Sequence, residues 1–253
     1  MPTWTPDALS SEAGPLRGRC WRIVEAQHRV STLKLVDTLA ELELLEGLLE
    51  ATKPPVPAEC RHLHYLLATP FRYGAPYPKG SRFRRAGHTP GVFYGSERVE
   101  TGIAEMAFHR LLFFAESPAT AWPDNASEFT AFRVSYATGR GLDLTAAPLS
   151  SDRARWMHPV EYEACQALAD NARAIDIQVL RHSSVRDPAA NTNVALLTCL
   201  AFASSEPEAR QSWRLRFSAT GAQALREHPP AALEFLAETF SGDPRIAASN
   251  RPG

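Results

Sequence analysis

The residue types best suited to chemistry in this 253-residue chain gather between Pro70 and Arg110. Guanidiniums, phenols and a carboxylate recur there, on Arg72, Tyr73, Arg82, Arg84, Arg85, Tyr94 and Glu105. A guanidinium offers planar, permanently charged, bidentate donors that suit phosphate. A tyrosine ring can stack on a flat heterocycle, and a carboxylate can stabilise a developing oxocarbenium ion. Such groups could hold a dinucleotide and break a glycosidic bond. The alternative is an Arg-rich, solvated surface.

Standard catalytic motifs of several enzyme classes are missing from the sequence. It has no GxGxxG, GxxxxGK[ST], HExxH or GxSxG pattern, which excludes the corresponding classes at the level of motifs. The eight histidines do not cluster as ligands, and the four cysteines form no CxxC pair. We therefore expect neither a bound metal nor a disulfide framework.

Composition is that of an ordinary soluble globular protein, with 44% hydrophobic and 22% charged residues. The length suffices for one substantial domain or two small ones. A net charge of -1 gives no sign of a nucleic-acid coat or of an anionic membrane surface as partner. No apolar run is long enough to span a membrane, so we expect a cytoplasmic protein.

Both helices and strands are expected to position the Arg, Tyr and Glu side chains. Apolar residues at helical spacing predict helices over residues 31–49, 101–115, 159–173 and 231–240. Alternating or continuous apolar runs predict strands over residues 63–68, 91–95, 129–136, 194–202 and 213–217, and another from 175 up to His182. The order lacks a regular βαβ rhythm, which predicts an α+β fold with a mixed sheet.

The two ends of the chain differ in composition from its middle. Residues 1–18 are rich in Pro, Ser and Gly and predict a loose arm. The helix after Ser31, its candidate N-cap, has a broad apolar face suited to a core or to a partner. We therefore expect an arm and helical segment over 1–58, a main domain over 59–241 and a disordered tail over 242–253.

Several motifs, in order along the chain, resemble the RES domain, a family named for an Arg, a Glu and a Ser. Gly80–Phe83 resembles its G-G-R-W element, Gly91–Ser96 its strand ending in Y-x-S, and Ala104–Glu105 its helical motif. The interval of 11 residues from Tyr94 to Glu105 is the one that the family uses. The resemblance spans roughly residues 63 to 203.

The remaining parts of the pattern lie on either side of those motifs. Ser184, in S-V-R-D-P, matches the family's late serine, and Arg72–Tyr73 resembles an earlier arginine element. The interval from Arg82 to Tyr94 is about two residues longer than usual, so either Arg82 or Arg84 could be the functional guanidinium.

The resemblance implies a fold like that of ADP-ribosyltransferases and an NAD-consuming toxin of a bacterial toxin–antitoxin pair. NAD would be the consumed substrate, with no metal. The partner would be a small Xre-like helix-turn-helix antitoxin, so that DNA is contacted only through it. The implied roles are a pyrophosphate clamp for Arg72 and Arg82, nicotinamide stacking for Tyr73 or Tyr94, a ribose or carboxamide bond for Ser184, and oxocarbenium stabilisation or acceptor orientation for Glu105.

Several alternatives remain open at the level of sequence. The acceptor could be water, phosphate or a protein side chain, giving a glycohydrolase, a phosphorylase or an ADP-ribosyltransferase. The chain could instead be a non-catalytic nucleotide- or protein-binding module with the same fold. An RNA-acting toxin is disfavoured by the net charge of -1. The apolar face over residues 30–49 could support a homodimer or an antitoxin contact.

Overall fold

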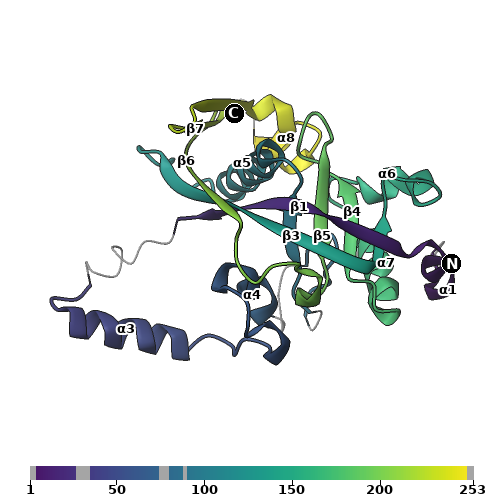
Figure 1. The fold of residues 1–253 in the computed structure, drawn as a ribbon. Coiled ribbons are helices and arrows are strands. Elements are labelled where there is room, and N and C mark those ends of the chain that lie inside the picture. Colours follow the sequence, from purple (N-terminus) through teal and green to yellow (C-terminus); the bar gives the residue numbers. More distant parts are fainter. Residues whose placement is uncertain (1–3, 27–34, 74–79, 88–89, 250–253) are drawn as a thin grey trace.

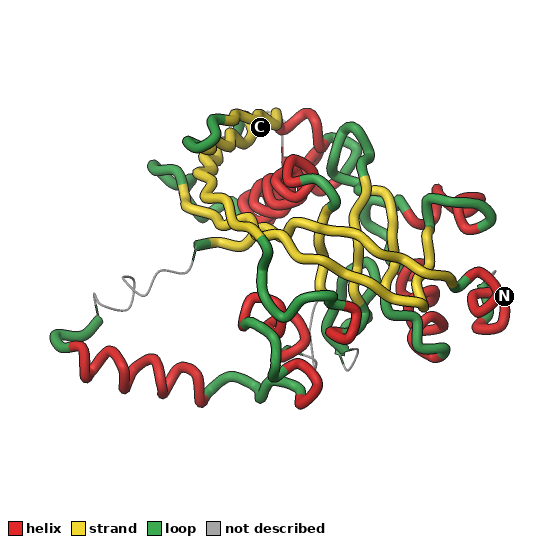
Figure 2. The backbone as a smooth tube through the Cα atoms, in the orientation of Figure 1, coloured by secondary structure: helices red, strands yellow, loops and turns green. Residues whose placement is uncertain are grey.

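The computed structural model describes residues 4–26, 35–73, 80–87 and 90–249 (Figures 1 and 2). Within these ranges, eight strands form one sheet in the order β1-β2-β5-β4-β3-β6-β7-β8, with an additional β1–β3 pairing. The strands are β1 (Gly14–Glu25), β2 (Phe93–Ser96), β3 (Ser127–Asp143), β4 (Val179–Ser183), β5 (Thr192–Leu196), β6 (Ala209–Ser218), β7 (Gly221–Arg226) and β8 (Ala231–Leu236). Of their pairings, β3–β4 is parallel and the others are antiparallel.

Helices cover the sheet and extend from it (Figure 1). They are α1 (Pro6–Glu12), α3 (Leu39–Ala51), α4 (Tyr65–Arg72), α5 (Val99–Glu116), α6 (Arg153–Trp156), α7 (Glu163–Ala174) and α8 (Pro244–Ser249). The long α5 buries Ile103 and Phe108 completely against residues of β1, β6 and β7. Helix α7 packs Leu168 against Leu180 of β4 and Ala195 of β5. The α+β expectation is confirmed.

Strand β1 parts from β2 midway along its length. It pairs with β3 from Gly14 to Glu25, but with β2 only at Trp21↔Ser96. Beyond Trp21 the strand therefore stays with β3 and leaves the edge of β2. This separation creates the space described below.

The loose arm expected over residues 1–18 is wrong for the residues that the structure describes. Thr5 caps α1 by accepting from the Ala8 N–H, and Leu9 of α1 is fully buried. The next residues begin β1, which lies inside the sheet. Strand pairing over more than a hundred residues outweighs a local composition that favours a loop.

The N-terminal helix begins later than predicted. Helix α3 starts at Leu39 with a capping box between Thr38 and Glu41, whereas Ser31 lies outside the described residues. Leu42 is buried, but Leu44 and Leu48 are mostly exposed. The broad apolar face therefore has little cover within the described chain, and α3 extends away from the sheet (Figure 1).

Two predicted elements have the wrong type, and part of the predicted tail forms a helix. The predicted strand over residues 63–68 is instead the start of α4, which begins at Tyr65 and is capped by the His64 side chain. Residues 231–236 form β8, which pairs along β7, and only 237–240 make a short 3-10 helix. The predicted tail is ordered as far as α8, because Asp243 is buried in an ion pair.

Strand boundaries also moved. Strand β4 begins at Val179, since Ile175 caps α7, and β5 ends at Leu196 before a short 3-10 helix over Cys199–Ala201. That helix carries Cys199, which forms a disulfide with Cys60. The expectation of no disulfide is therefore wrong. The two cysteines are 139 residues apart in the sequence, and no local pattern predicts that the fold brings them together.

In the part of the chain that the structure describes, no helix combines the length and the hydrophobicity that a membrane-spanning segment needs.

Candidate active site

Glu105 and Ser184 meet at the centre of the site. Glu105 lies in the second turn of α5, and its Oε1 accepts a hydrogen bond of 2.7 Å from the fully buried Ser184 Oγ. Ser184 Oγ in turn accepts from the backbone N–H groups of Arg186 (3.2 Å) and Asp187 (3.0 Å). These two donors hold the hydroxyl so that its proton faces the carboxylate. The fold thus joins two residues that are 79 positions apart.

Asn193 completes this cluster, and sequence reasoning missed it. Its Nδ2 donates to Glu105 Oε1 at 2.7 Å, while its Oδ1 accepts from Ser96 Oγ at 2.6 Å. Ser96 and Asn193 are register partners on β2 and β5, and both are buried. Ser96 is the serine of the Y-x-S motif, so the sequence did point to this residue. Asn193 directly precedes the strand predicted from residue 194 and belongs to none of the motifs recognised in the sequence.

Both of these donors reach the same carboxylate oxygen. Among the described residues, Glu105 Oε2 forms no hydrogen bond, while Oε1 accepts from Ser184 and Asn193. Glu105 is only half-buried, so one oxygen is held and the carboxylate edge stays accessible. Such a carboxylate can face a developing positive charge without losing its orientation.

Tyr94 lies on the same face of β2 as Ser96, because alternate residues of a strand share a face. Its hydroxyl pairs with Ser81 Oγ at 2.8 Å and accepts from the Phe83 N–H at 3.1 Å. Burial raises the pKa of the Tyr94 phenol, so it is neutral at physiological pH. The phenol therefore ties the loop that carries the predicted arginines to β2.

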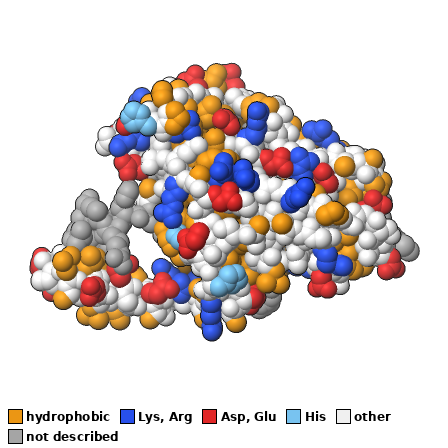
Figure 3. Space-filling model, viewed as in Figure 1, with side chains coloured by type: hydrophobic (Ala, Val, Ile, Leu, Met, Phe, Trp, Pro, Cys, Tyr) orange, Lys and Arg blue, Asp and Glu red, His pale blue; other side chains and the backbone are white. Residues whose placement is uncertain are grey.

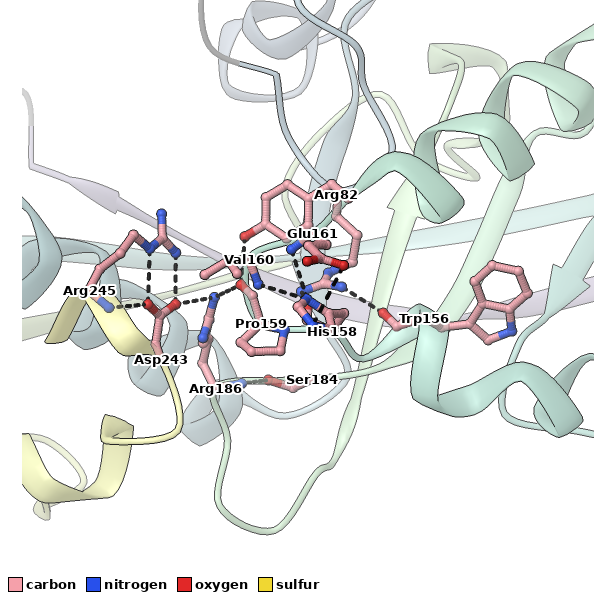
Figure 4. A network of polar contacts seen from close by, with 11 residues as sticks. Arg82, Trp156, His158, Pro159, Val160, Glu161, Ser184, Arg186, Asp243 and Arg245 are labelled. Atoms are coloured by element: carbon pink, nitrogen blue, oxygen red, sulfur yellow. Dashed lines mark hydrogen bonds and ion pairs between the residues drawn. The ribbon is translucent and has the colours of Figure 1, made fainter. Parts of the chain in front are cut away.

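Arg82 is directed at backbone carbonyls in Figure 4. It donates to Trp156 O at 2.6 Å and to His158 O at 3.1 Å, and its guanidinium lies 4.8 Å from the centroid of the Tyr162 ring. This geometry fastens the segment between α6 and α7 to the loop of Arg82. The same segment receives Arg186, which donates to Pro159 O at 2.6 Å.

The other predicted residues of the Arg/Tyr-rich stretch lie elsewhere. Arg72 pairs with Glu50 of α3 at 2.5 Å and donates to Pro54 O. Arg84 is buried and donates to Tyr73 O. The structure thus brings Glu105 to Ser184 but engages Arg72 and Arg82 with other protein groups. Their roles as a phosphate clamp stay predictions.

A cavity of about 610 Å³ lies between β1, α4 and the loop that ends in Arg84. Its lining includes the guanidiniums of Arg22, Arg84 and Arg210 and the rings of Tyr65, Tyr73 and Tyr94. Ser96, two residues from Tyr94, reaches Glu105 through Asn193. The residues of the carboxylate cluster are not among those that line the cavity.

A buried ion pair supports the loop of Ser184. Arg186 lies 3.0 Å from Asp243 (Figure 4). Its guanidinium is stacked 3.6 Å from the centroid of the Phe108 ring. Burial lowers the pKa of Arg186. Burial alone would raise the pKa of Asp243, but hydrogen bonds from Arg245 and the charge of Arg186 lower it. The pair anchors the C-terminal segment to the site.

Charges on the face seen in Figure 3 are mixed, with Lys and Arg interspersed among Asp and Glu and without a continuous basic stripe. This distribution gives no support to a nucleic-acid-binding surface.

Comparisons with known proteins place the chain in a family. No curated protein matches it. Its structure is similar to the crystal structure of the M. tuberculosis MbcT-MbcA toxin-antitoxin complex, with a TM-score of 0.47 and 13% identity, over 83% of this chain and 91% of that one. The model of the RES domain matches residues 56–218, which is more than half of the chain. The chain therefore belongs to the RES-domain family.

Proposed function

We propose that the protein is an NAD-consuming toxin of a bacterial toxin–antitoxin pair, which cleaves the bond between nicotinamide and ribose. The observation that carries this proposal is the cluster in which Ser184 and Asn193 both donate to Glu105 Oε1. A merely structural glutamate on α5 would not need two buried donors that are themselves held by other groups. Membership of the RES family supports the same activity.

The proposed reaction needs one carboxylate. Nicotinamide leaves NAD as a neutral ring from a cationic ground state, so the bond can break without a general acid. The ribose then acquires oxocarbenium character, which the carboxylate of Glu105 stabilises electrostatically. Ser184 and Asn193 keep that carboxylate aimed while the charge develops. Water, phosphate or a protein side chain can then complete the reaction.

The test is to incubate the purified protein with NAD, with and without phosphate, and to identify the products by mass spectrometry. Free ADP-ribose indicates a glycohydrolase, a phosphorylated ADP-ribose indicates a phosphorylase, and a labelled protein indicates a transferase. Glu105→Gln should fold normally and lose NAD consumption. Glu100→Gln is the matched control, because Glu100 is exposed on the same helix. Full NAD consumption by Glu105→Gln would refute the proposed role.

A non-catalytic nucleotide- or protein-binding module is the competing function. It predicts that Glu105→Gln still arrests growth when expressed in bacteria, since binding does not require the carboxylate. Loss of growth arrest together with loss of NAD consumption supports the enzyme.

We also propose that α3 contacts the partner, an Xre-like antitoxin or a second copy of this chain. Leu39, Leu44 and Leu48 are 72%, 65% and 58% exposed. The helix that carries them extends away from the sheet (Figure 1). Burying such side chains favours association. Light scattering of the protein alone and co-expressed with the product of a neighbouring helix-turn-helix gene tests this. Monomers in both samples would count against it.

A further inference from the structure

We propose that Asp243 is a positioning residue, which acts through Arg186 to hold the loop of Ser184 beside the catalytic carboxylate and to leave the charge of that carboxylate available to the substrate. The inference rests on the proposed function, in which the carboxylate faces a cationic ribose. Asp243 directly precedes α8 and lies outside residues 56–218, which the family model matches. The family pattern therefore does not assign it.

The hydrogen bond between Ser184 and Glu105 depends on the loop that follows β4. Ser184 Oγ donates to Glu105 Oε1 at 2.7 Å. It accepts from the backbone N–H groups of Arg186 and Asp187, at 3.2 Å and 3.0 Å. The Asp187 side chain accepts a hydrogen bond of 2.7 Å from Thr101 of α5, which is one tether of the loop to that helix. The direction of the Ser184 hydroxyl is therefore set by where the peptide units of residues 186 and 187 lie.

The Arg186 side chain is a second tether of this loop to α5. Its guanidinium lies 3.6 Å from the centroid of the Phe108 ring, and Phe108 is three residues beyond Glu105 on α5. Residues three apart are neighbours on the surface of a helix, so Arg186 holds the loop at the turn that carries the carboxylate. Its Nη2 donates to Pro159 O at 2.6 Å and lies 3.0 Å from Asp243 Oδ2 (Figure 4). Of these three contacts, the one with Asp243 joins opposite charges.

Asp243 also decides which carboxylate the Arg186 charge pairs with. Burial lowers the pKa of Arg186, and the negative charges of Asp243 and Glu105 both oppose that shift. In the part of the chain that the structure describes, the ion pair forms with Asp243 and not with Glu105. A buried cation that loses its partner is strongly unfavourable. Without Asp243, Arg186 would therefore be drawn towards Glu105, where it would compete with the serine hydroxyl and offset the negative charge that faces the ribose.

The test compares kcat and KM for NAD consumption in folded variants of the full-length protein. Asp243→Asn should lower kcat between about tenfold and a hundredfold, because displacement of a reacting group costs rate, and should leave KM nearly unchanged. Arg245→Ala should keep the wild-type kcat, because Arg245 bonds the same carboxylate from a position that is 36% exposed. Phe217→Ala is the stability control, since it removes a buried ring of β6 and should also keep the wild-type kcat while it is folded.

Two further measurements keep the test decisive if Asp243→Asn folds poorly. The double variant Arg186→Met/Asp243→Asn removes both charges together, which a protein tolerates better than the loss of one partner of a buried pair. It should fold and still have a lowered kcat, because the loop has lost its tether. Hydrogen exchange of the backbone amides of Arg186 and Asp187, followed by NMR, should be faster in this double variant than in Phe217→Ala, after correction for the free energy of global unfolding.

Several results would overturn the inference. These are wild-type kcat in folded Asp243→Asn or in the folded double variant, an equal loss of kcat in Phe217→Ala or Arg245→Ala, or unchanged amide exchange. Its failure is separable from that of the proposed function. NAD consumption that depends on Glu105 but not on Asp243 supports the enzyme without this inference. Faster exchange at residues 186 and 187 in a protein that never consumes NAD supports the tether and refutes the proposed activity.

Discussion

Breaking the Arg186–Asp243 ion pair should destabilise the protein strongly. The two side chains are 6% and 0% exposed, so Asp243→Asn leaves the Arg186 charge buried without its ion-pair partner, beside Pro159 O, the Phe108 ring and Tyr162. Removing one partner of a buried pair costs about 3–5 kcal/mol. Arg245 bonds the same carboxylate but is 36% exposed. Arg245→Ala should therefore cost about 1 kcal/mol or less.

Equilibrium unfolding in urea measures both values from the free energy of unfolding in water. The wild type should also lose stability as the pH falls below the ordinary aspartate value, because the folded-state pKa of Asp243 is lowered. Asp243→Asn should lack that component of the acid sensitivity. A loss below about 1 kcal/mol, or losses of equal size in the two variants, would refute the reasoning from burial.

Three further predictions concern stability. Burial lowers the pKa of His182 to about 3, so the folded state keeps it neutral while the unfolded chain protonates near its ordinary value. Stability should therefore fall by up to about 1.4 kcal/mol per pH unit below roughly pH 6.5. His182→Phe should flatten this slope in urea unfolding, and an unchanged slope would contradict the assignment. Tyr94→Phe removes the acceptor of the Phe83 N–H and should cost about 1–3 kcal/mol, measured in the same way. Gly91→Ala would place a Cβ 2.1 Å from Pro70 O and should lower the melting temperature, whereas Gly47→Ala, with nothing within 4 Å, should stabilise α3 by about 0.5–1 kcal/mol. Equal melting temperatures for the two alanine variants would count against this packing argument.

Some elements were predictable because their signals are local. Helix α5 and strands β2 and β6 carry regular apolar spacing and formed close to the expected places. Residues 231–236 also alternate, but proline residues ahead of them resembled a helix start. Their pairing with β7 decided for a strand.

The order of the motifs along the chain predicted Glu105 and Ser184 as site residues, and in the structure the two side chains form a hydrogen bond. Asn193 was not predictable, because its importance depends on the register that places it opposite Ser96. The same holds for Cys60 and Cys199, whose pairing needs two distant segments to meet.

Residue types and their order along the chain were determined by the sequence, including an excess of guanidiniums and phenols near one carboxylate. The directions in which those guanidiniums point were decided by tertiary structure. An arginine side chain is long and flexible, so its partner depends on which carbonyls, carboxylates and cavities the fold brings within reach. Arg82 thus donates to backbone carbonyls, while Arg22 lines the cavity. Arg22 lies on β1, whose first residues fall in the segment expected to be a loose arm.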